Sequence, residues 1–587
     1  MQEPEVTISP AHINPAGNSS FSWHEAAAIS LGLVVFCLFL FFYNLGRPAL
    51  FEPTEGRNAE IAREILLTHD WVTPHDDFVP VLDKPILFHW LIVFCYKLFG
   101  VSEWSARLTS ALAGLGSVIL VYLFAKEFLG LWEALWSVLI LASSVQFYAL
   151  SRIVIFDMPL NFFVTLSLCC FYWGANSGSG FKKKAFYMVM YAAMGGGTLI
   201  KGPIGLFLPG MVIFFYMSVA KKWFLLREMN LFHGVNLFLT IVVPWYIWAE
   251  IRNPGYLYYF LSEENVLRFV TPHFNRSEPF YYFLGVLAVG FMPWTFLLPY
   301  VIRAQWMKSK DETTLFLVLW VILPYLLFSF SQTKLSHYIL PIYPPLAILV
   351  GEALTTSLKH LSKKKRWPLW LPAFDLFLMF GVVSVGVYRP ELLPHPVQEA
   401  VRTALREAPG FLIFALLLAT IWLALSTSRY FPKSQSALYL FCCAAFALYF
   451  VFVQLIVENV ALNTSSKVLA AKLAPLIRPN DQLVIYHNFC SSLPYYLNIE
   501  RPLWVVSSKK DRSIMESYYV AEKHPQPPAV YGKALFNREE FSELWKTSKK
   551  KLFVVIQEKN LPRLVGKNQN FPEIKLRSGE FVLVTNF

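Results

Sequence analysis

Long apolar runs recur from residue 25 to about residue 460, and they constrain the fold more than any other feature of the sequence. Each run is about 17–25 residues long, the length that a helix needs to cross roughly 30 Å of hydrocarbon. Of the 587 residues, 56% are hydrophobic and only 15% are charged, whereas a soluble protein carries about 25% charged residues. The sequence therefore predicts a polytopic α-helical membrane protein.

The runs predict about thirteen membrane-spanning helices and their orientation. The candidate spans are 25–43, 104–125, 132–150, 159–175, 185–200, 203–220, 231–250, 281–302, 313–330, 338–357, 368–388, 410–427 and 437–459. The pair around Lys201 can also be read as one broken helix. Short basic loops alternate along the chain, and they explain the formal charge of +12 without nucleic acid. They place the N-terminus in the cytoplasm, and an odd number of spans then puts the C-terminal tail outside.

The first outer loop, residues 44–103 of a transmembrane domain placed at 1–460, is rich in charge. Its stretch from Phe51 to Gly100 is dense in carboxylates, cations and aromatic side chains. Because charge is costly in lipid, this stretch must lie at a membrane surface or line a cavity. The helical spacing of apolar residues in Thr54–Leu67 and Pro85–Phe99 predicts two helices lying in the interface.

The tail, residues 461–587, is polar and has a different pattern. Short β-rich runs alternate with helical segments. The predicted strands are Gln482–Tyr486, Pro502–Val506, Lys551–Ile556 and Phe581–Thr585, and the predicted helices are Ser465–Leu476 and Arg538–Thr547. This order predicts a small α/β domain on the outer face, with a structural or substrate-guiding role.

Polar residues gather in four places that this topology puts on the outer face, and in one long loop. They are Glu52, Glu55, Arg57, Asp83 and Lys84; Arg152 and Asp157; Lys201; Lys334, His337 and Tyr338; and, in the loop, Glu263, Glu264, Asn265, Arg268, His273 and Arg276. Taken singly, each charge fits a side chain that snorkels to water or pairs with a neighbour. Together, Lys201, Arg268 and Lys334 oppose the positive-inside trend, which favours a bound phosphate. Carboxylates beside a phosphate can deprotonate an acceptor or stabilise positive charge on a sugar.

Several of these stretches resemble one family in the same order. PTEGRNAEIAREIL, HDWVTP, LDKPILFHW and FGVSEWSARL resemble the first outer loop of the aminoarabinose transferases, the enzymes that modify lipid A. LIKGP and KLSHYILPIYPPLA resemble later signatures of that family. More broadly, the chain looks like the polyprenyl-phosphate-sugar transferases related to protein mannosyltransferases. The resemblance covers Phe36 to about Leu349, and it implies the C-type glycosyltransferase fold with a periplasmic α/β tail.

The resemblance also implies residue roles. By position, the catalytic residues are Glu55 and Asp157, the donor phosphate ligands are Arg57, Lys84, Lys201, Arg268, Lys334 and Tyr338, and the supporting residues are Glu52, Asp83, Glu264 and His337. The family often has Asp before the first acid, where this chain has Thr54. Lipid A-modifying relatives tend to have Glu-His where this chain has Glu264-Asn265, which puts a metal site using that His in doubt. The seven cysteines show no metal-ligand spacing, and a divalent metal is the one cofactor left open.

These implications predict a transferase of the bacterial inner membrane. It takes a sugar from a polyprenyl-phosphate carrier of the undecaprenyl type and places it on lipid A or another envelope glycolipid. A protein acceptor is the close alternative. A lipid or sugar transporter is the alternative of another class, but it would show inverted repeats with paired broken helices, and the sequence shows neither. The sequence leaves open which sugar is transferred, which acceptor receives it and how many copies of the chain assemble.

Overall fold

The computed structural model describes most of the chain. The described residues are 23–271, 277–307, 311–359, 420, 435–478, 481–487, 489–507, 514–515, 517–548, 550–565, 573–578 and 581–586. Two predicted spans, 368–388 and 410–427, lie outside the described residues apart from Thr420. His273 and Arg276 of the long loop also lie outside them.

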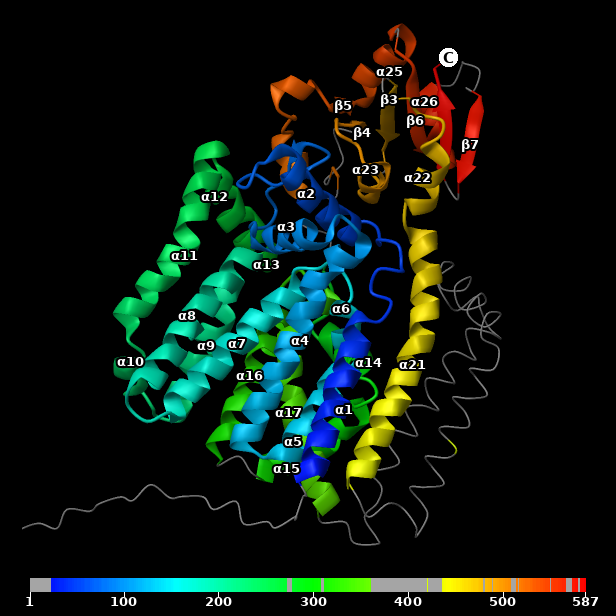
Figure 1. Cartoon of the computed structure of the whole chain (residues 1–587). Coiled ribbons are helices and arrows are strands. Elements are labelled where there is room, and N and C mark those ends of the chain that lie inside the picture. The colour runs from blue at the N-terminus through cyan, green and yellow to red at the C-terminus, as the bar shows by residue number, and fades with distance from the viewer. Residues whose placement is uncertain are drawn as a thin grey trace, which may run out of the picture.

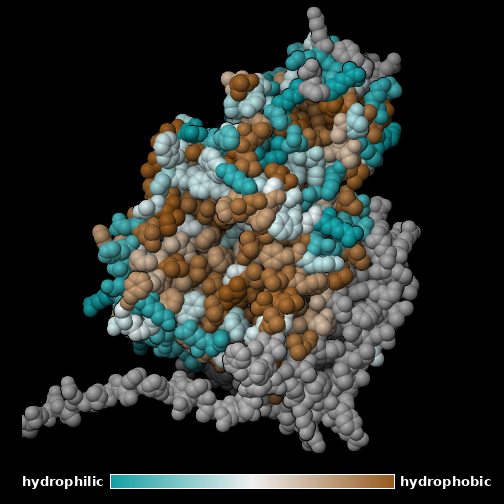
Figure 2. All heavy atoms as spheres, viewed as in Figure 1, coloured by the Kyte–Doolittle hydropathy of each residue, from teal (hydrophilic) through white to brown (hydrophobic). Residues whose placement is uncertain are grey.

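The helical body is a polytopic membrane bundle (Figure 1). Its helices are α1 (Trp23–Phe42), α4 (Glu103–Phe128), α5 (Leu131–Ser143), α6 (Val145–Leu150), α7 (Asp157–Asn176), α8 (Phe181–Lys201), α9 (Ile204–Val219), α10 (Leu225–Glu228), α11 (Leu231–Arg252), α14 (Tyr282–Gly290), α15 (Leu298–Met307), α16 (Glu312–Phe330), α17 (Tyr343–Lys359) and α21 (Gln435–Thr464). Among the described residues, six helices are long and apolar enough to span a membrane, or seven with one bent pair. Shorter apolar helices accompany them. Figure 2 shows hydrophobic side chains across the middle of this body, with hydrophilic ones on the tail above.

Two predicted spans are interrupted, and the predicted division between 185–200 and 203–220 is confirmed. The span expected at 132–150 is divided into α5 and α6 at Ser144. The span expected at 281–302 is wrong as a single helix, because its two halves are bent by 114°. The pair around Lys201 is two helices, since Gly202 has a φ of +86° that few other residues adopt. This break leaves Lys201 at the end of α8 instead of inside a span.

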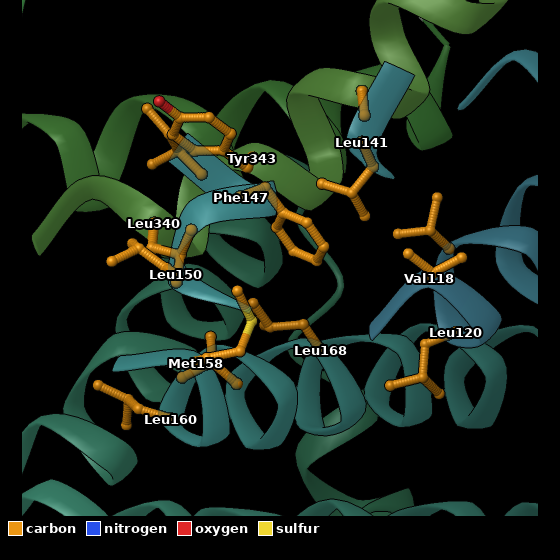
Figure 3. Packing of buried hydrophobic residues seen from close by; sticks show 14 of the residues in the cluster. Val118, Leu120, Leu141, Phe147, Leu150, Met158, Leu160, Leu168, Leu340 and Tyr343 are labelled. Carbon is orange, nitrogen blue, oxygen red and sulfur yellow. The ribbon is translucent and has the colours of Figure 1, made fainter. Parts of the chain in front are cut away.

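One continuous apolar core joins these helices. Figure 3 shows part of it, where Phe147 of α6, Met158 of α7 and Leu340 belong to the same buried cluster. Leu340 lies in the 3₁₀ helix η4 (Ser336–Ile342), which leads into α17. Met158 is fully buried and directly follows Asp157. Apolar packing therefore fixes the start of α7, where one of the predicted site residues lies.

The first outer loop lies between the bundle and the tail (Figure 1). It contains α2 (Thr54–Thr68), the short antiparallel pair β1 (His75–Asp76) and β2 (Val79–Pro80), and α3 (Leu87–Phe99). Both predicted helices are confirmed. The long loop after α11 adds α12 (Tyr256–Tyr258), the π-helix η1 (Tyr259–Leu267) and α13 (Arg268–Val270). Both loops thus bring charged residues to the same end of the bundle.

The tail is the predicted α/β domain. Its strands are β3 (Gln482–Tyr486), β4 (Trp504–Ser507), β5 (Leu535–Asn537), β6 (Leu552–Gln557), β7 (Ile574–Ser578) and β8 (Phe581–Thr585), in the order β5-β4-β3-β6-β8-β7. Its helices are α22 (Lys467–Leu473), α23 (Ser492–Leu497), α24 (Tyr518–Lys523), α25 (Arg538–Thr547) and α26 (Leu561–Val565). The first four strands are parallel, and β8 and β7 are antiparallel neighbours. Strands β5 and β7 were not predicted, because β5 is very short and β7 is only partly buried.

Polar contacts join the tail to the first loop. The Ser492 amide donates to Glu52 at 2.8 Å, and the Leu503 amide donates to Asp77 at 2.9 Å. The contact is close, since a Cβ on Gly56 would lie 2.7 Å from the Ser492 nitrogen. The loop and the tail therefore form one packed unit above the bundle.

Arg107 of α4 forms a buried ion pair with Glu55 of α2. Its guanidinium donates to both carboxylate oxygens, at 2.9 and 2.7 Å, and to three backbone carbonyls. Those carbonyls belong to Leu45, Pro48 and Ala49, in the segment after α1. Both side chains are almost fully buried. One interaction therefore holds a spanning helix, the entry to the loop and the start of α2 together.

Removing this ion pair is expected to destabilise the protein strongly. Arg107→Leu leaves the Glu55 charge buried without its partner, which typically costs about 3–5 kcal/mol. The matched control is Lys467→Ala, which removes the more exposed Lys467–Glu103 pair and should cost about 0–1 kcal/mol. The free energy of unfolding, measured in detergent by tryptophan fluorescence, separates the two outcomes. Equal effects of the two substitutions would contradict the central role of Arg107.

Candidate functional site

A polar cavity of about 140 Å³ lies where the two outer loops meet the ends of the spanning helices. The residues that line it come from seven separate stretches of the chain. They are Pro53, Thr54, Arg57, Asn58, Asp83, Lys84, Ile155, Phe156, Asp157, Lys201, Glu264, Arg268, Leu335, His337, Tyr338 and Tyr518. Four of these residues are Lys or Arg and three are Asp or Glu, so the cavity is charged and slightly positive.

Lys84 and Arg268 share one carboxylate oxygen of Glu264. Glu264 lies in the π-helix η1, which brings it opposite the first loop. Burial lowers the pKa of the Lys84 ammonium from 10.5 to about 8, although Glu264 favours the charged form. Burial alone would raise the pKa of Glu264, but the charges of Lys84 and Arg268 outweigh it and lower that pKa. The trio holds two cations against one carboxylate.

A second ion pair joins α7 and α8. The Lys201 ammonium donates to Asp157 at 2.6 Å, at the point where α8 ends and α7 begins. The other carboxylate oxygen of Asp157 lies 3.5 Å from Nε2 of His337. The Lys201 nitrogen also lies 4.8 Å from the centre of the Tyr338 ring, within cation–π distance. The break at Gly202 is what allows Lys201 to reach this group.

Asp83 connects three elements at the rim of the cavity. It accepts hydrogen bonds from the Tyr259 hydroxyl at 3.1 Å and from the Tyr519 amide at 3.2 Å. Arg57 lies 3.7 Å from its other oxygen. Since Asp83 directly precedes Lys84, these contacts also fix the backbone that carries the lysine.

Three predicted site residues do not line the cavity. Glu55 is buried against Arg107 and also accepts the Val154 amide at 2.8 Å. Glu52 accepts bonds from Ser466 and Ser492 of the tail. Lys334 donates to the backbone carbonyls of Ser331 and Glu278, at 2.6 and 2.9 Å. The geometry gives these residues contacts that hold loops together.

The other nine predicted site residues line the cavity, and several further lining residues were not predicted. The latter include Thr54, Asn58 and Tyr518. Asn58 carries no charge and occurs inside an amphipathic helix. Its only signal in the sequence is its place one turn after Thr54, on the same face of α2. Tyr518 lies in the tail, and the sequence shows no signal that connects it with the loop. Only the folded structure shows that Tyr518 lines the cavity together with residues of the first loop.

The described side chains do not form a set of metal ligands. Among the residues that the structure describes, no three His, Cys, Asp or Glu side chains converge as the ligands of a metal ion would. Asn265, which stands beside Glu264, lines a neighbouring cavity. A divalent metal therefore stays a prediction without a ligand set in this part of the chain.

Comparisons with known proteins agree with this architecture. Residues 83–248 match the family model described as dolichyl-phosphate-mannose-protein mannosyltransferase. The undecaprenyl phosphate-alpha-4-amino-4-deoxy-L-arabinose arabinosyl transferase of Aeromonas hydrophila is 32% identical over 367 residues, which are 61% of this chain and 66% of that protein. The enzyme of the same name from Pseudomonas aeruginosa is 32% identical over 56% of this chain and 60% of that protein. The matched region thus spans less than two thirds of either relative.

The crystal structure of ArnT from Cupriavidus metallidurans, bound to undecaprenyl phosphate, matches with a TM-score of 0.80 and 26% identity. The match covers 96% of this chain and 98% of that one. The chain therefore resembles the aminoarabinose transferases both in sequence and in fold. An archaeal oligosaccharyltransferase from Archaeoglobus fulgidus shares the fold alone, with a TM-score of 0.51 and 12% identity. The aminoarabinose-transferase-like fold accounts for the bundle, the first loop and the tail together.

The depressed pKa of Lys84 can be measured directly. Since burial lowers this pKa to about 8, the Lys84 amine should react with an acylating reagent with a midpoint near that pH. Glu264→Gln removes a carboxylate that favours the charged form, so its midpoint should be lower still. Peptide mass spectrometry after labelling across a pH series, with a soluble lysine derivative as the reference, reports both. A midpoint near the ordinary 10.5, or a higher one in Glu264→Gln, would contradict the assignment.

Proposed function

We propose that this protein is a glycosyltransferase that moves a sugar from an undecaprenyl-phosphate-type carrier to lipid A or another envelope glycolipid. The observation that carries the proposal is the overlap of two cavities. The polar cavity shares Lys84, Asp157, Lys201, Glu264, Arg268 and Tyr338 with a second cavity of about 110 Å³. The second cavity adds apolar side chains, among them Leu160, Ile204, Phe269 and Phe328. An apolar groove that ends in cations suits a phosphate carried on a long hydrocarbon chain.

The relatives support the nature of the donor. The named relatives are undecaprenyl phosphate-aminoarabinose arabinosyl transferases, and the matching crystal structure contains undecaprenyl phosphate. In this proposal the polyprenyl chain occupies the apolar side, and the phosphate meets Lys84, Lys201 and Arg268. These cations stabilise the phosphate as a leaving group, as preorganised positive charge does at other transferred phosphates. Arg57 and Tyr338 complete that end of the site.

Asp157 is the proposed group that faces the acceptor. It orients the acceptor, and it takes a proton where the acceptor is a hydroxyl, since a phosphate acceptor is already ionised. A single direct displacement then inverts the configuration at the anomeric carbon. Glu55 fixes the backbone near Asp157, because it accepts a hydrogen bond from the Val154 amide three residues before Asp157. Asp83, Glu264 and His337 support the cations and Asp157.

The proposed location is the bacterial inner membrane, with thirteen spans, a cytoplasmic N-terminus and a periplasmic tail. The first outer loop, which contributes Arg57, Asp83 and Lys84 to the cavity, lies at the same end of the bundle as the tail (Figure 1). Lys183, in the first turn of α8, and Lys222, in the loop after α9, pair with Glu228 and Glu312 and line neither cavity. The positive-inside rule then supports the cytoplasm for those loops. The second candidate is a protein acceptor with the same donor, which the mannosyltransferase family match favours.

Loss of the Lys84 charge should abolish the modification. Lipid A from cells that express the parent protein is expected to gain a sugar-sized mass, and cells with Lys84→Ala should lack it. Lys222→Ala is the matched control, because Lys222 pairs with Glu312 and does not line either cavity. Mass spectrometry of total envelope lipids measures the result. Sugar transfer to protein with no change in lipid A would move the acceptor to the second candidate, and full activity of Lys84→Ala would refute the site.

Asp157→Asn should separate binding from transfer. The substitution removes the carboxylate that Lys201 contacts at 2.6 Å, so affinity for the anionic carrier should not fall. The rate of transfer should fall by about 10²–10⁴-fold, the usual contribution of a positioned acid or base. Binding of undecaprenyl phosphate and single-turnover transfer, measured on the same detergent preparation, test the two parts. Equal losses of binding and rate would assign Asp157 to donor binding instead.

A further inference from the structure

The two ends of the site differ in charge, and under the proposed function this difference orients the donor. The residues that line only the second cavity carry no charge, include the apolar Leu160, Ile204, Phe269 and Phe328, and come from spanning helices, their ends and the long outer loop. The residues that line only the first cavity include Arg57, Asn58, Asp83 and Tyr518. Under the proposed function the hydrocarbon chain lies on the apolar side and the phosphate lies at the shared cations. The sugar must then extend into the polar end.

Tyr518 is the one tail residue among those described that line this polar end. It begins α24, and every other lining residue belongs to the membrane domain. Ser517 caps the helix by accepting the Val520 amide at 3.1 Å, and Ser517 is fully buried. A tyrosine offers a sugar an apolar ring face for its C–H groups and a hydroxyl that both donates and accepts.

The tail holds Tyr518 against the first loop by independent contacts. The Tyr519 amide donates to Asp83 at 3.2 Å, and the Tyr519 ring lies 5.1 Å from that of Tyr259. Val520 is fully buried in an apolar cluster with Val79 and Val81 of the loop. These contacts flank Tyr518 on its C-terminal side, so the wall of the cavity that it forms is set by how the tail docks.

We propose that Tyr518 is a specificity-determining residue that contacts the transferred sugar, so that the tail domain completes the sugar-binding end of the site. This inference rests on the proposed function and deepens it, since it names the part of the substrate that the tail recognises. It assigns the phosphate to the membrane domain and part of the sugar recognition to the tail. The membrane domain then recognises the phosphate of the donor, and the tail domain helps to recognise its sugar.

The test compares Tyr518→Ala and Tyr518→Phe with Tyr531→Ala. Tyr531 is a matched control in the same domain, because its ring packs on Phe78 of the first loop at 4.7 Å and does not line the cavity. The probes are undecaprenyl phosphate alone, for binding, and undecaprenyl-phosphate aminoarabinose and undecaprenyl-phosphate mannose, for transfer to lipid A.

Tyr518→Ala should bind undecaprenyl phosphate as the parent does, while its kcat/KM for the better sugar donor falls by about tenfold or more. Tyr518→Phe keeps the ring, so it should retain more of this activity and change the ratio of kcat/KM between the two sugars. Tyr531→Ala should match the parent in all three measurements.

Two results overturn the inference alone. One is a Tyr518→Ala enzyme with the parent's kcat/KM for both sugars. The other is an equal loss of affinity for undecaprenyl phosphate and for the sugar donors, which would mean a purely structural role. A parent protein that binds undecaprenyl phosphate but transfers neither sugar overturns the proposed function, and the inference falls with it.

Discussion

The buried ion pair between Arg107 and Glu55 is the interaction on which the rest of the site depends. Arg107 gathers the segment after α1 by three carbonyls and fixes the start of α2 through Glu55. Glu55 in turn holds the Val154 amide, in the segment that leads to Asp157. Burying two charges is costly, and the pair is tolerable because almost every polar atom on it has a partner. A carboxylate in a conspicuous acidic motif can therefore act through loop position instead of through contact with substrate.

The sequence predicted the scaffold better than the roles of single residues. Apolar run length located α4, α7, α9, α11, α16 and α17 within a few residues, because the hydrocarbon thickness is a constraint on every span. Charge pattern placed Lys201 and Arg268 on one face, the family resemblance added Lys84 and Asp157 to the site, and all four line one cavity. The same pattern could not separate them from Lys334. A charged residue near a span has several possible partners, and Lys334 donates to the backbone carbonyls of Ser331 and of Glu278 in the long loop.

The remaining differences arise where the backbone departs from a regular helix. The breaks at Ser144 and Gly202 and the bend of 114° after Gly290 all fall inside apolar stretches that read as continuous or uncertain spans. Irregular backbone at such depths is tolerated where it is buried in protein or lines a cavity. The break at Gly202 has the clearest consequence, since it brings the Lys201 ammonium to Asp157. Hydropathy averages over Ser144 and over the bend after Gly290 and so cannot detect them, whereas Gly202-Pro203, a recognised helix breaker, stands where the predicted spans 185–200 and 203–220 are divided.

The charges of the cavity imply how a phosphate would be held. Arg57, Lys84, Lys201 and Arg268 face three carboxylates, Asp83, Asp157 and Glu264, and each cation lies near at least one of them. An incoming phosphate must therefore compete with carboxylates for its cations, which lowers its net binding energy but keeps the cations buried and oriented beforehand. Preorganisation of this kind favours the charge that develops on the leaving phosphate over the smaller charge of the bound donor. The carboxylates then matter as much as the cations, because without Glu264 the Lys84 ammonium would lose the charge that opposes the effect of burial and its pKa would fall further.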